Sequence, residues 1–318
     1  MTTDDNLIGI QPSPEEKEDF WTKMKKNPLL WKVLRPDLTT EEKPAEPSKD
    51  ETNAHTNSAA LVVATWEEKN KRSKLYVFPS ELKDSTFAVI GIRGWTIDSL
   101  CSHEGVLYET GTGKIRHSSD GRVASLSPYN TGINHMCSDS RQGILFSRQE
   151  KIYCLVPNTT SNSNVFTFRA QPAAISHVRN IYIHEGKIHY VQAGKMWREE
   201  ADGDVIVQDL PIVEDILVGI HSLNSKLYVV SKDVIYVTEP QHTQSVFQSF
   251  HDSTTSSCVH NGTICTGEKM ISGMAGNQST LGSCINVHDI KNGTTTRIHS
   301  FPEEVITAMC SHTPEVKE

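Results

Sequence analysis

The sequence lacks the features that mark membrane, secreted and nucleic-acid-binding proteins. It contains no apolar run of about 18 residues, the length that a membrane-spanning helix needs. Its opening residues, MTTDDNLIGI, have neither the basic start nor the apolar stretch of a secretory signal. The net charge of -8 at pH 7 argues against the basic face with which proteins bind nucleic acids. We therefore expect no membrane association and no nucleic-acid partner.

Closely spaced cysteine pairs, which hold metals or form redox centres, are absent as well. The seven cysteines are spread from Cys101 to Cys310 and include no Cys-x-x-Cys pair. An odd number of dispersed cysteines is typical of reduced thiols, which predicts a location in the cytoplasm or nucleus.

Catalytic and cofactor motifs are also missing. The stretch Gly111-Thr-Gly-Lys114 is not a phosphate-binding loop, because Tyr108 stands where that motif needs its first glycine and Ile115 where it needs Ser or Thr. No Gly-x-Ser-x-Gly elbow of a serine hydrolase occurs. We expect no cofactor, and the sequence assigns no catalytic or metal-binding residue.

The N-terminal segment 1–36 is expected to be helical. Ser13 and Glu16 form a capping box, and the helix that follows would carry Phe20, Trp21 and Met24 on one face. This face could pack on the flank of its own domain or dock into a groove of a partner protein. Residues 37–56 have almost no large apolar side chain and predict a disordered linker.

From residue 57 to 318, short β-like runs alternate with turn residues and recur with a period. Six related segments, IDSLC, INHMC, VRNIY, ILVGI, TTSSC and ITAMC, begin at Ile97, Ile133, Val178, Ile216, Thr254 and Ile306. Three further runs follow each of the first four segments, as VLYETG, KIRH and RVASL follow the first. Four short strands in a unit of about 40 residues are typical of β-propeller blades.

The two ends of the repeat region complement each other. The last unit stops after its first strand, EEVITAMCSH, whereas the first folded segment lacks that strand and begins with ALVVATW, KLYVFPS and TFAVIGI. Joining these segments completes one blade and removes two unpaired edges. The count is then six blades, and an insertion in the last unit leaves room for a seventh.

On these segments the chain resembles the β-propeller superfamily, with degenerate repeats of the WD or kelch kind. His288-Asp289 stands where a WD repeat carries Trp-Asp, and no other unit has a Trp-Asp pair. The resemblance implies an all-β fold, a six-bladed β-propeller closed by the C-terminal strand, with the short helical segment before it.

The repeat also indicates the role of the cysteines and histidines. One repeat position holds Cys101, Cys137, Cys258 and Cys310, with Tyr182 and Ile220 in the equivalent places. Such variety favours buried packing over ligand binding. Four histidines, His103, His184, His260 and His312, lie at the turns between first and second strands, so a shared metal site is not expected.

Loops that enter the inner strands are the predicted contact surface, because propellers usually bind through this face. The predicted contact residues are Arg93, Trp95, Asp98, Asn134, Arg179, Asp215 and Asp252. Trp and Arg commonly anchor protein interfaces, so Trp95 with Arg93 is the first choice. The predicted function is a non-catalytic scaffold or adaptor that binds a protein partner.

An enzymatic alternative comes from the resemblance alone. Six-bladed propellers include metal-dependent lactonases and esterases, whose chemistry needs oxygen ligands around a cation in the central channel. The residues that could supply them are Asp98, Asn134, Asn180, Asp215 and Asp252. They do not share one repeat position, and fold alone does not decide function.

Overall fold

The computed structural model describes eleven stretches of the chain. These are residues 59–82, 87–119, 133–139, 143–148, 151–156, 164–170, 178–200, 202–239, 242–248, 254–272 and 279–313. The predicted helical segment 1–36, the linker 37–56 and Asp252 lie outside them, as does the RVASL run that was expected to form a fourth strand.

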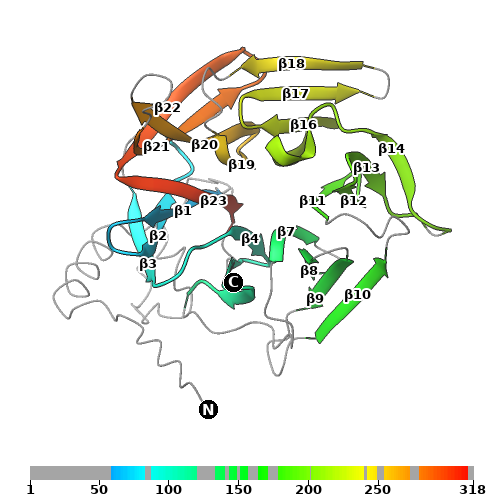
Figure 1. Ribbon diagram of the computed structural model, residues 1–318, viewed down its shortest axis with the longest axis horizontal. Helices are drawn as coiled ribbons and strands as arrows, with labels where there is room; N and C mark the ends of the chain where they lie inside the picture. Colours follow the sequence, from blue (N-terminus) through cyan, green and yellow to red (C-terminus); the bar gives the residue numbers. More distant parts are fainter. Residues whose placement is uncertain are drawn as a thin grey trace, which may run out of the picture.

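The described chain is an all-β, six-bladed β-propeller (Figure 1). From the centre outward, blade 1 contains β23 (Glu304–His312), β1 (Ala60–Glu67), β2 (Arg72–Phe78) and β3 (Ala88–Arg93). Blade 2 contains β4 (Ser99–His103), β5 (Val106–Gly111) and β6 (Lys114–His117). Blade 3 contains β7 (Ile133–Asp139), β8 (Gly143–Arg148), β9 (Lys151–Val156) and β10 (Asn164–Ala170).

The other three blades repeat this antiparallel arrangement. Blade 4 contains β11 (Asn180–His184), β12 (Lys187–Gln192), β13 (Lys195–Arg198) and β14 (Val205–Asp209). Blade 5 follows a short 3-10 turn, η2 (Glu214–Ile216), and contains β15 (Leu217–Leu223), β16 (Lys226–Ser231), β17 (Val234–Glu239) and β18 (His242–Gln248). Blade 6 contains β19 (Thr254–His260), β20 (Thr263–Ser272), β21 (Ser279–Asp289) and β22 (Thr294–Pro302).

The predicted ring closure is confirmed. β23 pairs antiparallel with β1 from Ala60 opposite His312 to Glu67 opposite Glu304, so the last strand supplies the inner strand of the first blade. Each inner strand contacts the inner strands on both sides of it, and together they surround the centre (Figure 1). Pairing the two chain ends in one sheet removes the open edges that a linear array would have.

Tight turns join the inner strand to the second strand. Glu104 and Gly105 have φ of 47° and 72°, and Asn261 and Gly262 have φ of 46° and 75°. Positive φ at both central residues belongs to the type I′ turn, whose twist matches that of the flanking strands. The turns that the sequence predicts beside His103 and His260 are therefore confirmed.

The hydrophobic core lies between blades. Alternate side chains of a strand point to opposite faces of its sheet, so β1 packs Val62 and Ala64 against blade 2 while Leu61 and Val63 pack against blade 6. Similar apolar clusters fill the other boundaries around the ring. The side chains at each boundary therefore decide how firmly neighbouring blades hold together.

Two details of the predicted repeat change. The assignment of Ile220 to the cysteine position was wrong. The register of β15 shifts between Leu217 and Gly219, and His221, not Ile220, occupies the position equivalent to Cys101. The insertion in the last unit extends the two middle strands of blade 6, with 10 residues in β20 and 11 in β21. The sheets confirm the propeller but do not confirm that its repeats are of the WD or kelch kind.

Candidate functional site

The ring has two distinct faces because all inner strands run in the same direction. Their first residues meet at one face, here named the entry face, and their last residues meet at the other, named the turn face. Of the predicted contact residues, Arg93, Trp95, Asp98, Arg179 and Asp215 lie at the entry face. The side chain of Asn134, like the whole of Asp252, lies outside the described part of the structure.

The structure brings two of the predicted contact residues together. Arg179 Nη2 lies 3.4 Å from Asp215 Oδ1, and the side chains are 48% and 79% exposed. An ion pair this exposed contributes about 0–1 kcal/mol, because water and salt screen it. Asp98 is apart from them, and desolvation by the surrounding protein raises the pKa of its carboxyl.

Arg93 forms an ion pair inside the boundary between blades 1 and 2. Its Nε donates to Glu109 Oε1 at 2.8 Å, and its Nη2 donates to the carbonyl oxygen of Ser118 at 2.5 Å. The Arg93 side chain is 12% exposed and that of Glu109 is fully buried. Arg93 therefore joins β3 to blade 2, and a role in partner binding stays a prediction.

Trp95 packs beside this ion pair. Its half-buried ring contacts the core cluster between blades 1 and 2, and the guanidinium carbon of Arg116 lies 4.4 Å from the ring centroid. A Cβ atom added to Gly111 would lie 2.3 Å from Trp95 Cδ1, so the ring closes directly over this glycine. Trp95 is thus a packed residue of the entry face rather than a freely exposed anchor.

The charges in this cluster occupy a repeat position that is uncharged in the other blades. Glu109 on the second strand pairs with Arg116 on the third. The equivalent pairs are Val63–Tyr76, Phe146–Tyr153, Tyr190–Trp197, Val229–Tyr236 and Thr266–Asn286. Blade 2 therefore has a buried acid and base where four blades have apolar or aromatic pairs and blade 6 has a neutral polar pair. Arg93 compensates the acid, and the Trp95 ring stacks on Arg116.

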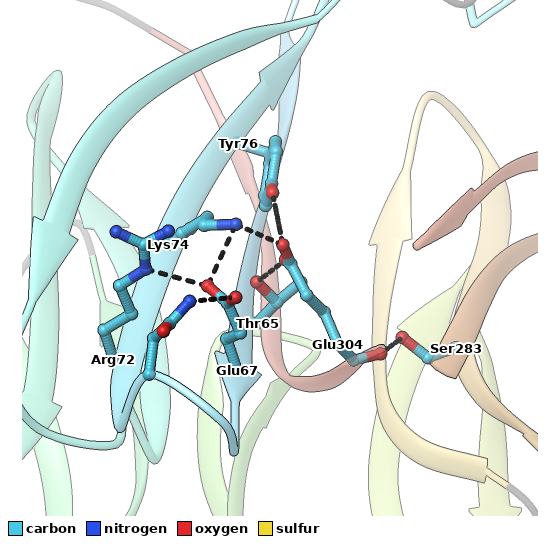
Figure 2. A network of polar contacts seen from close by, with 8 residues as sticks. Thr65, Glu67, Arg72, Lys74, Tyr76, Ser283 and Glu304 are labelled. Atoms are coloured by element: carbon cyan, nitrogen blue, oxygen red, sulfur yellow. Dashed lines mark hydrogen bonds and ion pairs between the residues drawn. The ribbon is translucent and has the colours of Figure 1, made fainter. Parts of the chain in front are cut away.

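A second polar network lies where the ring closes (Figure 2). Glu304, the first residue of β23, accepts hydrogen bonds from Thr65 Oγ1 at 2.6 Å and Tyr76 Oη at 2.9 Å. Lys74 Nζ donates to its other carboxylate oxygen at 2.5 Å, and Ser283 Oγ of blade 6 donates to its backbone oxygen at 2.8 Å. Burial and the Glu304 charge raise the pKa of Tyr76, so this hydroxyl stays a donor.

Histidine–serine hydrogen bonds link inner strands at the turn face. A ring nitrogen of the last residue of one strand meets a serine Oγ of the next, in His312–Ser102 (2.8 Å), His103–Ser138 (2.8 Å), His184–Ser222 (2.9 Å) and His260–Ser311 (3.1 Å). Between β15 and β19 the same bond is shifted two residues along the strand, to His221–Ser257 at 2.8 Å. These histidines therefore connect neighbouring blades through hydrogen bonds.

Within the described residues, no group of three or more His, Cys, Asp and Glu side chains is placed to hold a metal ion. Asn180, one of the oxygen donors considered for a channel cation, is buried in β11 at 1% exposure. In the same part of the chain no helix is long and apolar enough to cross a membrane.

The outer edge of blade 4 exposes an unusual amount of apolar surface. Among the described residues six large apolar side chains are exposed, and four of them lie between 205 and 213: Val205 (39%), Ile206 (49%), Val207 (39%) and Val213 (69%). The first three form the beginning of β14, which lies at the outer rim of the ring (Figure 1).

The outer strands β3 and β22 do not share this property. β3 has no exposed residue, and the exposed residues of β22 are Thr294, Thr295, Thr296, Arg297 and Pro302. Exposed strand edges in natural proteins usually carry Lys, Pro or other polar residues that prevent pairing with another chain. β14, with the sequence VIVQD, has none of these at its centre.

Neither the charged pair of blade 2 nor the apolar edge of blade 4 was predicted, although the sequence carries signals for both. Comparing the second and third runs of each repeat shows Glu109 and Arg116 against apolar and aromatic residues in four other units. Val205–Val207 was assigned to a fourth strand, but three consecutive β-branched residues in an outermost strand were not considered as a surface.

Comparisons with known proteins show the fold. No family model and no curated protein matches the sequence. Among solved structures, TolB from Acinetobacter baumannii superposes with a TM-score of 0.56 at 9% identity, over 81% of this chain and 67% of that one. A Lactobacillus plantarum protein gives 0.50 at 9% identity, over 81% and 99% of the two chains. Catalytically inactive virginiamycin B lyase from Staphylococcus aureus gives 0.47 at 14% identity, over 80% and 88%.

Proposed function

We propose that this protein is a non-catalytic scaffold that binds another protein through the outer edge of blade 4. The observation that carries the proposal is the run of exposed residues Val205, Ile206 and Val207 on the outermost strand, with Val213 close behind in the sequence. Exposed apolar side chains gathered on one element are characteristic of interaction sites, because covering them with a partner removes them from water.

The rest of the ring suits this role. Buried charges at the boundary of blades 1 and 2, the Glu304 network at the closure and the histidine–serine bonds all hold blades in fixed positions. A rigid ring presents a preformed surface, and preformed surfaces lose less conformational entropy when a partner binds. The entry-face residues Arg179 and Asp215 remain a second surface that the same partner could reach.

We assign the scaffold to the cytoplasm or nucleus. None of the seven cysteines forms a disulfide bond, and six of them are buried. Burial raises the pKa of Cys101 to about 12 and that of Cys310 well above its usual range, so both stay protonated, unreactive thiols. Free thiols in the core support a reducing compartment.

The test compares the full chain with two single variants. Ile206→Lys places a charge in the apolar edge of blade 4, and Thr296→Lys places the same charge on the exposed outer strand of blade 6 as a control. Proteins recovered with each variant from native lysate are identified, and the leading partner is purified and titrated by calorimetry. We expect Ile206→Lys to weaken its affinity at least tenfold, and Thr296→Lys to leave it within twofold. Equal affinity for all three proteins would refute the assignment of this edge.

A further inference from the structure

The geometry of β14 points to a specific mode of binding: we propose that the edge of blade 4 accepts an extended, apolar segment of a partner protein, flanked by basic residues, as an added β-strand. This inference rests on the proposed function and defines the partner's chemistry. Three features of the edge lead to it: its open side, its side chains and its charge.

The first feature is an unpaired strand edge. In the sheet of blade 4 the order is β11-β12-β13-β14, so β13 is the only neighbour of β14 among the described strands. The backbone groups on the outer side of β14 therefore have no sheet partner there. An extended peptide can pair with such groups and continue the sheet, which is how strand addition provides affinity.

The pairing of β14 is also regular enough to template another strand. Its register against β13 shifts once, between Met196 and Trp197. Third and fourth strands show the same shift in blades 5 and 6, at Ile235/Tyr236 and Ile285/Asn286. The bulge therefore belongs to the twist of each blade and is not a device that protects this particular edge.

The second feature is the exposure of consecutive side chains. Val205 and Ile206 point to opposite faces of the sheet, because side chains alternate along a strand. Val207 is the extra residue at the register shift, between the pairs Trp197–Ile206 and Met196–Gln208. All three are exposed, so the strand offers apolar contacts on both faces. A partner strand with β-branched residues would place its side chains beside them, and such cross-strand pairs stabilise a sheet.

The third feature is the charge around the edge. Asp202 and Asp204 precede β14, Asp209 ends it, and no basic residue lies between Asp202 and Asp209. The nearest basic side chains on β13 already have acidic partners, since Lys195 binds Asp209 at 2.8 Å and Arg198 binds Glu200 at 2.6 Å. Lys195 balances Asp209, whereas Asp202 and Asp204 leave the beginning of the edge acidic. Basic residues that flank the added strand place a positive charge beside these two acids in either strand direction.

The same charges disfavour a second copy of this chain as the occupant. A second copy of β14, with the sequence VIVQD, would bring no Lys or Arg to the acids at the beginning of the edge. The Lys195 of such a copy is already paired with its own Asp209. We therefore commit to a different protein with a basic, β-branched segment.

The test uses the full chain and three synthetic peptides. The first, Lys-Lys-Val-Thr-Val-Thr-Val-Lys-Lys, has the proposed chemistry. The second replaces its lysines with glutamates, and the third replaces its threonines with prolines, which cannot donate backbone hydrogen bonds. Calorimetry at low salt should give a Kd on the order of 10–100 µM for the first peptide, with at least tenfold weaker binding for the other two. Ile206→Lys should abolish binding of the first peptide, and Thr296→Lys should leave it within twofold.

Each other outcome overturns a defined part of the proposal. Equal binding of the glutamate peptide refutes the basic flanks, and equal binding of the proline peptide refutes strand addition. A dimer in sedimentation experiments that Ile206→Lys dissociates would show that a second copy occupies the edge. If no peptide binds while a captured partner protein still depends on Ile206, the binding mode is wrong and the scaffold function stands. If neither peptide nor partner depends on Ile206, both proposals are wrong.

Discussion

Replacing Arg93 by methionine tests whether the buried charges of blade 2 are balanced by an arginine from blade 1. The Arg93→Met side chain keeps much of the arginine's apolar volume but removes the hydrogen bond to Glu109 Oε1 and the one to Ser118. Glu109 is fully buried, and its Oε2 already has no hydrogen-bond partner among the described residues. The substitution therefore leaves a carboxylate in the core with much less compensation.

The expected loss of stability is large. Removing one partner of a buried ion pair costs about 3–5 kcal/mol, because the remaining charge stays desolvated. Arg93 is 12% exposed, so some water can reach the vacated position, and we expect a value near the lower limit, about 3 kcal/mol. The matched control is Arg179→Met, which removes an exposed ion pair at the same face and should cost less than about 1 kcal/mol.

Urea unfolding followed by circular dichroism measures both variants. A second variant, Arg93→Met with Glu109→Val, gives blade 2 the valine that blades 1 and 5 carry at this position, Val63 and Val229. We expect it to recover at least half of the loss, since the unpaired acid is gone. The reasoning is refuted if Arg93→Met costs no more than Arg179→Met, or if adding Glu109→Val lowers stability further.

Three other predictions concern the closure, the packing and the pH dependence of the ring. Glu304→Ala should lower the free energy of unfolding by about 3–5 kcal/mol, because Lys74 and the Tyr76 hydroxyl lose their buried acceptor. Hydrogen exchange should then accelerate in β1 and β23, and unchanged protection there would contradict the closure role. Gly111→Ala should cost about 1–3 kcal/mol by thermal or urea unfolding, because the new methyl group needs the space of the Trp95 ring, and a neutral result would exclude this close packing. Burial lowers the pKa of His221 and His312 to about 4, so between about pH 6.5 and pH 4 the unfolded chain binds these protons and the folded chain does not. Stability should therefore hold above about pH 6.5 and fall as the pH drops toward 4, by about 2 kcal/mol per histidine at pH 5. Urea midpoints that do not change between pH 7.5 and 5 would refute this prediction.

The sequence predicted the blades because their signals are local. Turn pairs such as Glu104-Gly105, with their positive φ, and the alternation of apolar residues act within a few positions of the chain. Ring closure was also predictable, because a final unit with one strand and a first unit with three complete each other. The interpretation failed by one residue in β15, where the register shift near Gly219 does not show in the spacing of apolar residues.

The candidate sites depend on contacts between distant segments, and the sequence by itself did not determine them. Alternation along the strand predicts that Glu109 shares a face of the sheet with residues two positions away. Only the packing of blade 1 on blade 2 shows that Arg93 reaches it. Trp95 was chosen as a contact residue for its type and position in a loop, and only the tertiary structure shows that Arg116 and Gly111 enclose it.

The same division applies to the whole molecule. Local sequence determined the strands and the turns, because these arise from backbone preferences and from short-range alternation of side chains, and it left six or seven blades as alternatives. Tertiary structure decided which histidines contact serines, how Glu304 holds the ring closed and that the outer edge of blade 4 exposes apolar side chains at Val205–Val207. These outcomes depend on how sheets pack face to face around a closed ring, and that geometry is set by all blades together rather than by any one segment.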